Sequence, residues 1–470
     1  MGNMKMTGPP VDTSTRAYGF AFPADVEPGS ELVLHLSHPR GRAVIDVFMI
    51  TSEATYVETW DIDCAQNQVG DFWQAWKWNP TPVKVSEGFS PGVYIATIRE
   101  HENDPRSVPP ADSRHGQFVF CVLPVRTHAS VLYKLPFLTY QAYNMSGGGC
   151  LYGSDRDDYA PGTGPSTITL KRPGAGTGGP VKGHPDLYAP DTPRQSFSHW
   201  DRDMIGFLSE NGIDFDVCTD VALDDERIDL SSYRLIVSSG HDEYWTENEF
   251  ARINDFIRRG GNYANFGANT CWWRVRREAD VVTCTKFPAG SGPDTDPDRC
   301  LDAPDHWWHW SEHHQFLGAS YLSGGARGEG IREQVGFTVV APGHWVFDGC
   351  HLEPGAVIGD HYSLVGYECD GAAIARTETG SYRLTHQDST PAGFELLAVA
   401  ELDERASAPW NFPARPAAIS GPRAATMGLI DDGTHGRVFT AGTTDWTRGL
   451  QEDPVVAQIT LNVLQKLSRD

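Results

Sequence analysis

The segment Ser239 to Trp245 carries three titratable side chains in a row, followed by two aromatic residues. It reads Ser-Gly-His-Asp-Glu-Tyr-Trp and lies between an apolar run and a helical pattern. In an extended segment His241 and Glu243 point to one side while Asp242 points to the other. Buried charged groups need a partner, a hydrogen bond or a metal, so His241 and Glu243 are candidates for one cleft. The equally weighted alternative is that Asp242 or Glu243 only caps the following helix.

Two further segments place polar side chains after apolar runs. Leu138 to Asn144 reads Leu-Thr-Tyr-Gln-Ala-Tyr-Asn and is expected to end a strand before a glycine loop. Because tyrosines are common at half-buried strand ends, this motif alone indicates little. Val365 to Glu368 places a carboxylate after an apolar run, as a general base near a low-dielectric wall would be. A surface glutamate is the simpler interpretation of Glu368.

Residues 306–314 are rich in imidazole and read His-Trp-Trp-His-Trp-Ser-Glu-His-His. The spacing of His306, His309 and His313 can place three ligands on one helical face, which would suit a zinc hydrolase. Three tryptophans so close together favour a packed or substrate-facing segment instead, and no His-Glu-x-x-His signature is present. A zinc site is therefore the less favoured interpretation of this segment.

Composition narrows the classes of partner. The 470 residues include 38 Lys and Arg against 62 Asp and Glu, a formal net charge of -24, which repels phosphate backbones and anionic lipids. No apolar run approaches the roughly 20 residues that span a bilayer. We expect a cytoplasmic protein that acts on a small molecule and binds neither nucleic acid nor a membrane. The oligomeric state stays open, and a homo-oligomer is one option.

The amino-terminal part of the chain reads as all-β. Residues 1–15 are small and polar and predict a flexible terminus. Residues 16–124 contain short β-branched and aromatic runs separated by Pro-Gly pairs, among them 32–36, 43–50, 93–98 and 117–122. This spacing predicts a small β-sandwich.

Residues 125–470 predict an α/β domain, because strands there alternate with capped helices. Strands over 233–238 and 262–266 flank a helix that starts with the capping box Thr246 and Glu249. Such a βαβ unit implies a parallel sheet, whose carboxyl edge is where open α/β sheets bind ligands. The Gly- and Pro-rich stretch 147–193 is too long for an ordinary connection and predicts a functional lid or a mobile loop.

Several of these segments occur together in one known family. Their combination and order resemble the large (beta) subunit of N,N-dimethylformamidase and its relatives, from about residue 20 to the end. The segments that carry the resemblance are Pro91 to Tyr94, Leu138 to Asn144, Leu151-Tyr152, Gly240 to Trp245, Gly366 to Glu368 and Ala441 to Trp446.

The resemblance implies an immunoglobulin-like β-sandwich followed by a glutamine-amidotransferase-like, flavodoxin-like α/β domain. It also implies hydrolysis of an amide at a mononuclear ferric iron (Fe3+) that two tyrosines and one glutamate bind. By the same resemblance the glutamate ligand is Glu243, the neighbouring histidine is His241, one tyrosine is Tyr143 and a catalytic glutamate is Glu368. The natural amide and the need for an accessory subunit stay open.

The second tyrosine departs from the family pattern. Relatives carry Arg-Pro-Tyr in the glycine loop, whereas Gly174 follows Arg172-Pro173 here. We take Tyr152 as the second metal ligand, with Tyr159 and Tyr188 as alternatives.

The implied chemistry is coherent. Phenolate and carboxylate oxygens are hard donors that suit ferric iron, and the ion would either polarise an amide carbonyl or lower the pKa of a bound water. Glu368 would take a proton from water and deliver it to the departing amine, while His241 would either stabilise the developing oxyanion or orient the water. The competing hypothesis, which Gly174 favours, is a non-catalytic binding module on the same scaffold that has lost its metal.

Overall fold

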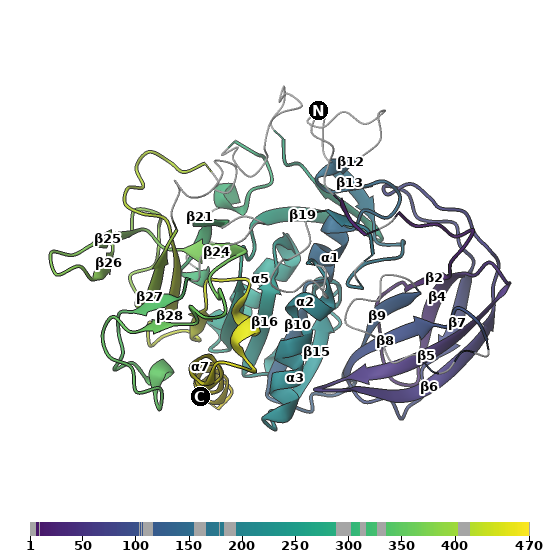
Figure 1. The fold of residues 1–470 in the computed structure, drawn as a ribbon, viewed down its shortest axis with the longest axis horizontal. Coiled ribbons are helices and arrows are strands. Elements are labelled where there is room, and N and C mark those ends of the chain that lie inside the picture. The colour runs from purple at the N-terminus through teal and green to yellow at the C-terminus, as the bar shows by residue number, and fades with distance from the viewer. Residues whose placement is uncertain are drawn as a thin grey trace. The chain divides into compact units, whose positions relative to one another are not determined.

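The computed structural model describes residues 6–8, 10–102, 104, 106, 116–154, 166–177, 179–182, 194–287, 302–310, 316–326, 335–402 and 414–469. The described part is mostly β, with several sheets and few helices (Figure 1). The chain divides into two compact units. The first comprises Met1–Ala129, Tyr133–Ile228 and Val275–Cys284, and the second comprises Ser130–Leu132, Asp229–Arg274 and Thr285–Asp470. The expected domain limits at residues 15 and 124 stay predictions.

Two sheets share one apolar core in the first unit. One has the order β2-β4-β7 and the other β3-β9-β8-β5-β6. All their pairings are antiparallel except β3 with β9. Side chains of both sheets, such as Leu34 and Val47, belong to one buried cluster, so this is a two-sheet sandwich. The strands are β2 (Tyr18–Ala21), β3 (Asp25–Val26), β4 (Glu31–Ser37), β5 (Arg42–Ile50), β6 (Ala54–Asp63), β7 (Pro80–Lys84), β8 (Gly92–Ile98) and β9 (Gln117–Val122).

The four strand predictions for this region are confirmed, since β4, β5, β8 and β9 cover them. The immunoglobulin-like topology stays a prediction.

The rest of the first unit has short elements. Strand β10 (Val131–Leu135) has its first two residues in the second unit and the others in the first, and the next segment is helix α1 (Phe137–Tyr143). The expectation that residues 138–144 end a strand was therefore wrong. Asp220 explains the helix, because its Oδ2 accepts the Leu138 backbone N–H at 2.8 Å, a partner distant in sequence. The other elements are β1 (Met6–Thr7), β11 (Gly149–Cys150), β12 (Gly153–Ser154), β13 (Ser166–Thr169), β14 (Val181–Lys182), α2 (Phe197–Trp200), α3 (Arg202–Glu210), β15 (Phe215–Thr219), α4 (Asp220–Asp224), β19 (Trp273–Glu278) and β20 (Val281–Cys284).

The second unit contains the predicted βαβ unit. Strand β16 (Leu235–His241) pairs in parallel with β18 (Asn262–Ala268), and helix α5 (Glu247–Arg258) connects them after the short strand β17 (Tyr244–Thr246). Thr246 caps α5, because its Oγ1 accepts the Glu249 backbone N–H at 3.1 Å. Both predictions are confirmed.

The sheet that contains β16 and β18 is mixed. It continues as β29-β28-β27-β22-β23. Strand β29 is parallel to β18, but every later pairing is antiparallel. The expected parallel sheet therefore covers only three of these strands. A short loop joins β28 to β29, and parallel neighbours need a longer crossover. The strands are β22 (Phe337–Val339), β23 (Val357–Ile358), β27 (Phe394–Glu401), β28 (Ala424–Ile430) and β29 (Val438–Thr440).

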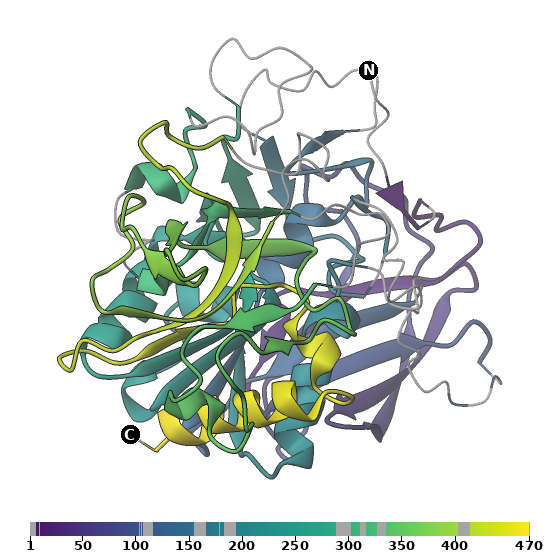
Figure 2. The same ribbon diagram turned by 60° about the vertical axis from the view of Figure 1, so that its left-hand side comes forward.

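Two hairpin-like ladders and a terminal helix complete the second unit. Strand β21 (Ser320–Ala326) pairs with β24 (Glu368–Gly371), and β25 (Ile374–Arg376) pairs with β26 (Tyr382–Leu384). Helix α7 (Pro454–Leu467) is yellow in Figure 2. It is joined to neighbouring elements by polar side chains, because Asn462 Nδ2 donates to the Val346 carbonyl and Asn262 Nδ2 donates to the Leu467 carbonyl. The single-turn 3-10 helices are η1 (Leu230–Ser232), η3 (Trp307–Trp310), η4 (Trp345–Phe347) and η6 (Trp446–Gly449).

Among the described residues, no helix combines the length and the apolar character needed to cross a lipid bilayer.

Candidate active site

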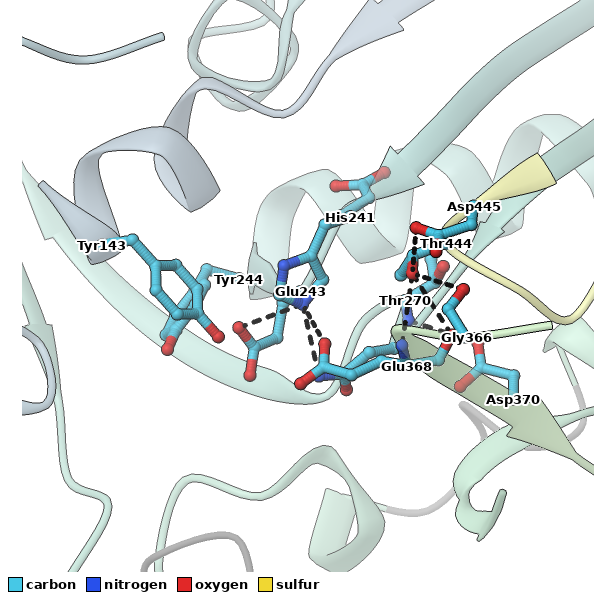
Figure 3. Close-up of polar contacts among 12 residues, drawn as sticks. Tyr143, His241, Glu243, Tyr244, Thr270, Gly366, Glu368, Asp370, Thr444 and Asp445 are labelled. Carbon is cyan, nitrogen blue, oxygen red and sulfur yellow. Dashed lines mark hydrogen bonds and ion pairs between the residues drawn. The ribbon is translucent and has the colours of Figure 1, made fainter. Parts of the chain in front are cut away.

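The carboxyl end of β16 places His241 and Glu243 together, as the alternation of an extended segment predicts. Both side chains are buried, and His241 Nε2 lies 3.5 Å from Glu243 Oε2 (Figure 3). Asp242 is directed elsewhere, since its Oδ1 accepts the Trp245 indole N–H at 2.9 Å. Thr246 supplies the side-chain cap of α5, so neither carboxylate is needed as that cap. This outcome favours the functional interpretation of the segment.

Glu368 joins this pair from β24. Its Oε2 lies 2.8 Å from His241 Nε2, and the residue is 7% exposed. The Glu368 backbone N–H donates to Thr444 Oγ1 at 3.2 Å, and its carbonyl accepts the Thr444 backbone N–H at 3.0 Å. The preceding Gly366 is held in the same way, because its N–H donates to Thr443 Oγ1 at 3.1 Å. The Ala-Gly-Thr-Thr-Asp-Trp motif therefore fixes the backbone that carries the predicted catalytic glutamate.

Asn269 is a site residue that sequence reasoning missed. It follows β18, whose register sets Ala268 opposite His241, and it is 2% exposed. Its Nδ2 donates to Glu368 Oε2 at 3.1 Å and lies 3.3 Å from His241 Nε2. The available signal was its place directly after a buried parallel strand, where side chains meet at the edge of the sheet.

The carboxylates determine the charge of the imidazole. Burial alone lowers the pKa of His241, but the Glu368 carboxylate and its hydrogen bond, with Glu243 and Asp242, outweigh burial and raise that pKa. The protonated ring is favoured, and its Nε2–H donates to Glu368. The group can therefore store and move a proton at Glu368 Oε2.

The two predicted tyrosines lie together in the first unit. Tyr143 ends α1 and Tyr152 follows β11. Their hydroxyl oxygens are 3.0 Å apart. The Lys182 ammonium lies 3.7 Å from the centroid of the Tyr152 ring, which is a cation–π contact. Tyr143 is 3% exposed, and Tyr152 is half-buried.

A buried arginine holds the loop that joins these tyrosines. Arg172 is 0% exposed. It donates to the carbonyl oxygens of Gln141, Ser146 and Gly149 at 2.7, 2.9 and 3.0 Å. Burial lowers the pKa of Arg172 to about 9. One side chain therefore connects the end of α1 to the start of the turn before Tyr152.

Gly174, the position at which the family resemblance predicts a tyrosine, has a backbone conformation that residues with side chains rarely adopt. Its φ is +101°, a region that L residues rarely adopt. A Cβ there would lie 2.9 Å from Ser146 Oγ and 3.1 Å from Asn144 Oδ1. In this chain a tyrosine at 174 would thus be strained, whereas Tyr152 already lies beside Tyr143. The alternatives Tyr159 and Tyr188 fall outside the described residues.

The structure describes two of the three histidines proposed to bind zinc. His306 is 1% exposed, with its ring centroid 4.5 and 4.1 Å from those of Trp272 and Trp273. Burial holds the pKa of His306 well below its ordinary value. His309 is exposed with its ring centroid 6.4 Å away, and His313 lies outside the described residues. In the part of the chain that the structure describes, no three His, Cys, Asp or Glu side chains form a group that could hold a metal.

Comparison with known proteins assigns the chain to a family. Residues 41–458 match the family described as "N,N-dimethylformamidase beta subunit-like, C-terminal". The chain belongs to this family, and the resemblance predicted from its motifs is confirmed.

Two curated relatives are each named N,N-dimethylformamidase beta subunit. The protein from Paracoccus aminophilus is 27% identical and the one from Alcaligenes sp is 26% identical, each over 228 residues. Those matches cover 44% of this chain and 28% of either relative, so the match spans little more than a quarter of the relatives' length. Among solved structures, a putative ThuA-like protein from Parabacteroides merdae covers 56% of this chain and 82% of its own, at 12% identity and a TM-score of 0.27.

Proposed function

We propose that the protein is an iron-dependent hydrolase that cleaves the C–N bond of a small amide. Two findings support the proposal: membership of the family over residues 41–458, and the buried site at the edge of the sheet. The observation that carries it is the contact of His241 Nε2 with Glu368 Oε2 at 2.8 Å and with Glu243 Oε2 at 3.5 Å. We also propose the immunoglobulin-like and glutamine-amidotransferase-like folds that the family resemblance implies, with the two-sheet core and the parallel β16-β18-β29 run as support.

Glu368 would act first as a base and then as an acid. A water molecule attacks the amide carbon, Glu368 accepts the proton of that water, and it then gives the proton to the departing amine nitrogen. Asn269 Nδ2 and the His241 ring lie beside the same carboxylate and can donate to the developing oxyanion. The C–N bond breaks to give a carboxylic acid and an amine.

The proposed metal ligands are Tyr143, Tyr152 and Glu243. Their chemistry fits ferric iron, because all three offer hard oxygen donors and the two phenol oxygens are 3.0 Å apart. Glu243 is fully buried. Bound iron would supply Lewis acidity toward the amide carbonyl.

The function can be tested by measuring amine release from a panel of amides, with N,N-dimethylformamide as the first member. We expect turnover by the wild-type protein, and for Glu368→Gln a kcat lower by about 10²–10⁴-fold, the usual range for assisted proton transfer. An iron-loaded protein that hydrolyses no amide in the panel would contradict the proposal.

Metal content of the purified protein tests the ligand assignment separately. We expect Glu243→Ala to lose both iron and the visible absorption of tyrosinate bound to ferric iron. Asp242→Asn is the matched control, because that neighbour is directed toward Trp245, and it should keep the metal. Full iron content in Glu243→Ala would contradict the assignment of Glu243 as a ligand. Zinc in the wild-type protein would favour the site proposed at His306, His309 and His313.

A further inference from the structure

A second buried carboxyl lies two residues after Glu368 in β24. Asp370 is 0% exposed and appears beside Glu368 in Figure 3. Its Oδ2 accepts the Thr270 backbone N–H at 3.3 Å. Its own backbone N–H donates to the Gly442 carbonyl at 3.2 Å. The carboxyl therefore holds the residue directly after Asn269 in the turn that follows β18.

That turn has an unusual backbone. Asn269 has a φ of +49°, a left-handed conformation that asparagine tolerates better than most residues but that needs support. The hydrogen bond from the next backbone N–H, that of Thr270, to the buried Asp370 carboxyl supplies this support. The same conformation brings the Asn269 amide to 3.1 Å from Glu368 Oε2 and 3.3 Å from His241 Nε2.

We propose that Asp370 is a positioning residue, which fixes the Asn269 turn so that the Asn269 amide stays against Glu368 and His241. The expected effect of Asp370 on kcat rests on the proposed function. Its effect on the conformation of the Asn269 turn does not. Asp370 reaches the reacting groups through Asn269.

The surroundings of Asp370 indicate that it acts as a neutral acid. Burial raises the pKa of Asp370 to about 8, with Glu368 raising it and the Thr270 and Asn269 N–H groups and His241 lowering it. Strands β18, β21 and β28, which pack against β24, carry no charged side chain. In the adjoining Ala441 to Trp446 segment, Asp445 is 3.6 Å from Arg448. At neutral pH an asparagine in this place would keep the acceptor oxygen and change little else.

The kinetic test compares Asp370→Asn with Asp370→Ala. We expect Asp370→Ala to lower kcat by up to about 100-fold, the size of effect that a misplaced group produces, with a smaller change in KM. Asp370→Asn should restore most of the lost kcat, because its amide oxygen can still accept the Thr270 N–H. In the Asn269→Ala background, Asp370→Ala should lower kcat no further. An equal loss in both backgrounds would overturn the proposal.

A buried carboxyl elsewhere in the same unit is the matched control. Asp388 is 3% exposed and accepts the Ala373 backbone N–H and the Ser323 hydroxyl. Asp388→Ala should lower the thermal stability without the kcat loss and without the dependence on Asn269. If Asp370→Ala does not fold, Asp370→Val, which keeps the volume and lacks the acceptor, takes its place.

Crystal structures of the variants decide the structural part without any activity. We expect Asn269 to leave its left-handed conformation in Asp370→Ala and to lose its contact with Glu368 Oε2, and to keep both in Asp370→Asn. An unmoved Asn269 in Asp370→Ala would refute the inference. A wild-type protein without amidase activity would refute the proposed function alone.

Discussion

Two regions of the molecule are held in different ways. One is the tyrosine loop, residues 143–152 with the adjoining residues 172–174, and the other is the sheet edge, formed by His241, Asn269 and Glu368. At the sheet edge, strand register places His241 and Asn269, and the side chains there bind one another. In the tyrosine loop, one cation, Arg172, binds three backbone carbonyls, and no carboxylate contacts its guanidinium among the described residues. The site at the sheet edge distributes its support over contacts between several side chains, whereas three carbonyl oxygens of the loop share one buried donor residue.

The largest effect should follow from removing that one residue. Arg172→Ala should lower the free energy of unfolding by about 3–5 kcal/mol, because three buried carbonyl oxygens each lose a donor at about 1–3 kcal/mol, partly offset by removing a buried charge. Arg172→Lys should lower the free energy of unfolding by less than Arg172→Ala. It should still be less stable than the wild type, because the lysine ammonium lacks the planar fork of the guanidinium. Urea unfolding of purified variants measures both.

Lys171 is the matched control for that measurement. Its side chain is 32% exposed, and its ammonium lies 3.2 Å from Asp280. Lys171→Ala should change stability by about 0–1 kcal/mol, as partly exposed ion pairs do. Similar losses in Lys171→Ala and Arg172→Ala would mean that the loop has no single support, and the contrast between the two regions would disappear.

The same contrast explains what the sequence could predict. Alternation along an extended segment placed His241 and Glu243 on one side, and the capping box at Thr246 located α5, because both signals are local. The position of Asn269 depended on which strand pairs with β16, and that of Asp370 on a strand a hundred residues away.

The errors of prediction also have physical causes. Helix α1 was missed because Asp220, a distant residue, accepts its first free N–H. The antiparallel part of the sheet was missed because the residue pattern of a strand is the same whichever way the strand runs. Only the connections between strands distinguish parallel from antiparallel pairing. The link from Tyr143 to Tyr152 was available only from the family resemblance, since a glycine loop has no periodicity.

A smaller effect tests whether the backbone of the tyrosine loop is confined by its neighbours. Gly174→Ala should cost about 1–3 kcal/mol for its backbone conformation alone, and more because its Cβ would meet Ser146 Oγ at 2.9 Å. Gly212→Ala is the matched control, with φ +64° and no atom within 4 Å of its Cβ. Chemical denaturation should therefore show the larger loss at Gly174. Equal losses would mean that the loop yields and that a tyrosine could be accommodated there.

The last effect concerns the sheet edge and depends on pH. Asp370 has a pKa raised from 3.8 to about 8 by burial, so between these values the folded protein holds a proton that the unfolded chain has released. The stability of the wild-type protein should then fall as pH rises across this window, by at most about 1.4 kcal/mol per pH unit from this group. Asp370→Asn cannot titrate, so its stability relative to wild type should rise from pH 5 to pH 8 and level off above. A difference between the two proteins that stays constant over this range would show that Asp370 is already ionised, and that the sheet edge, like the tyrosine loop, contains a buried charge.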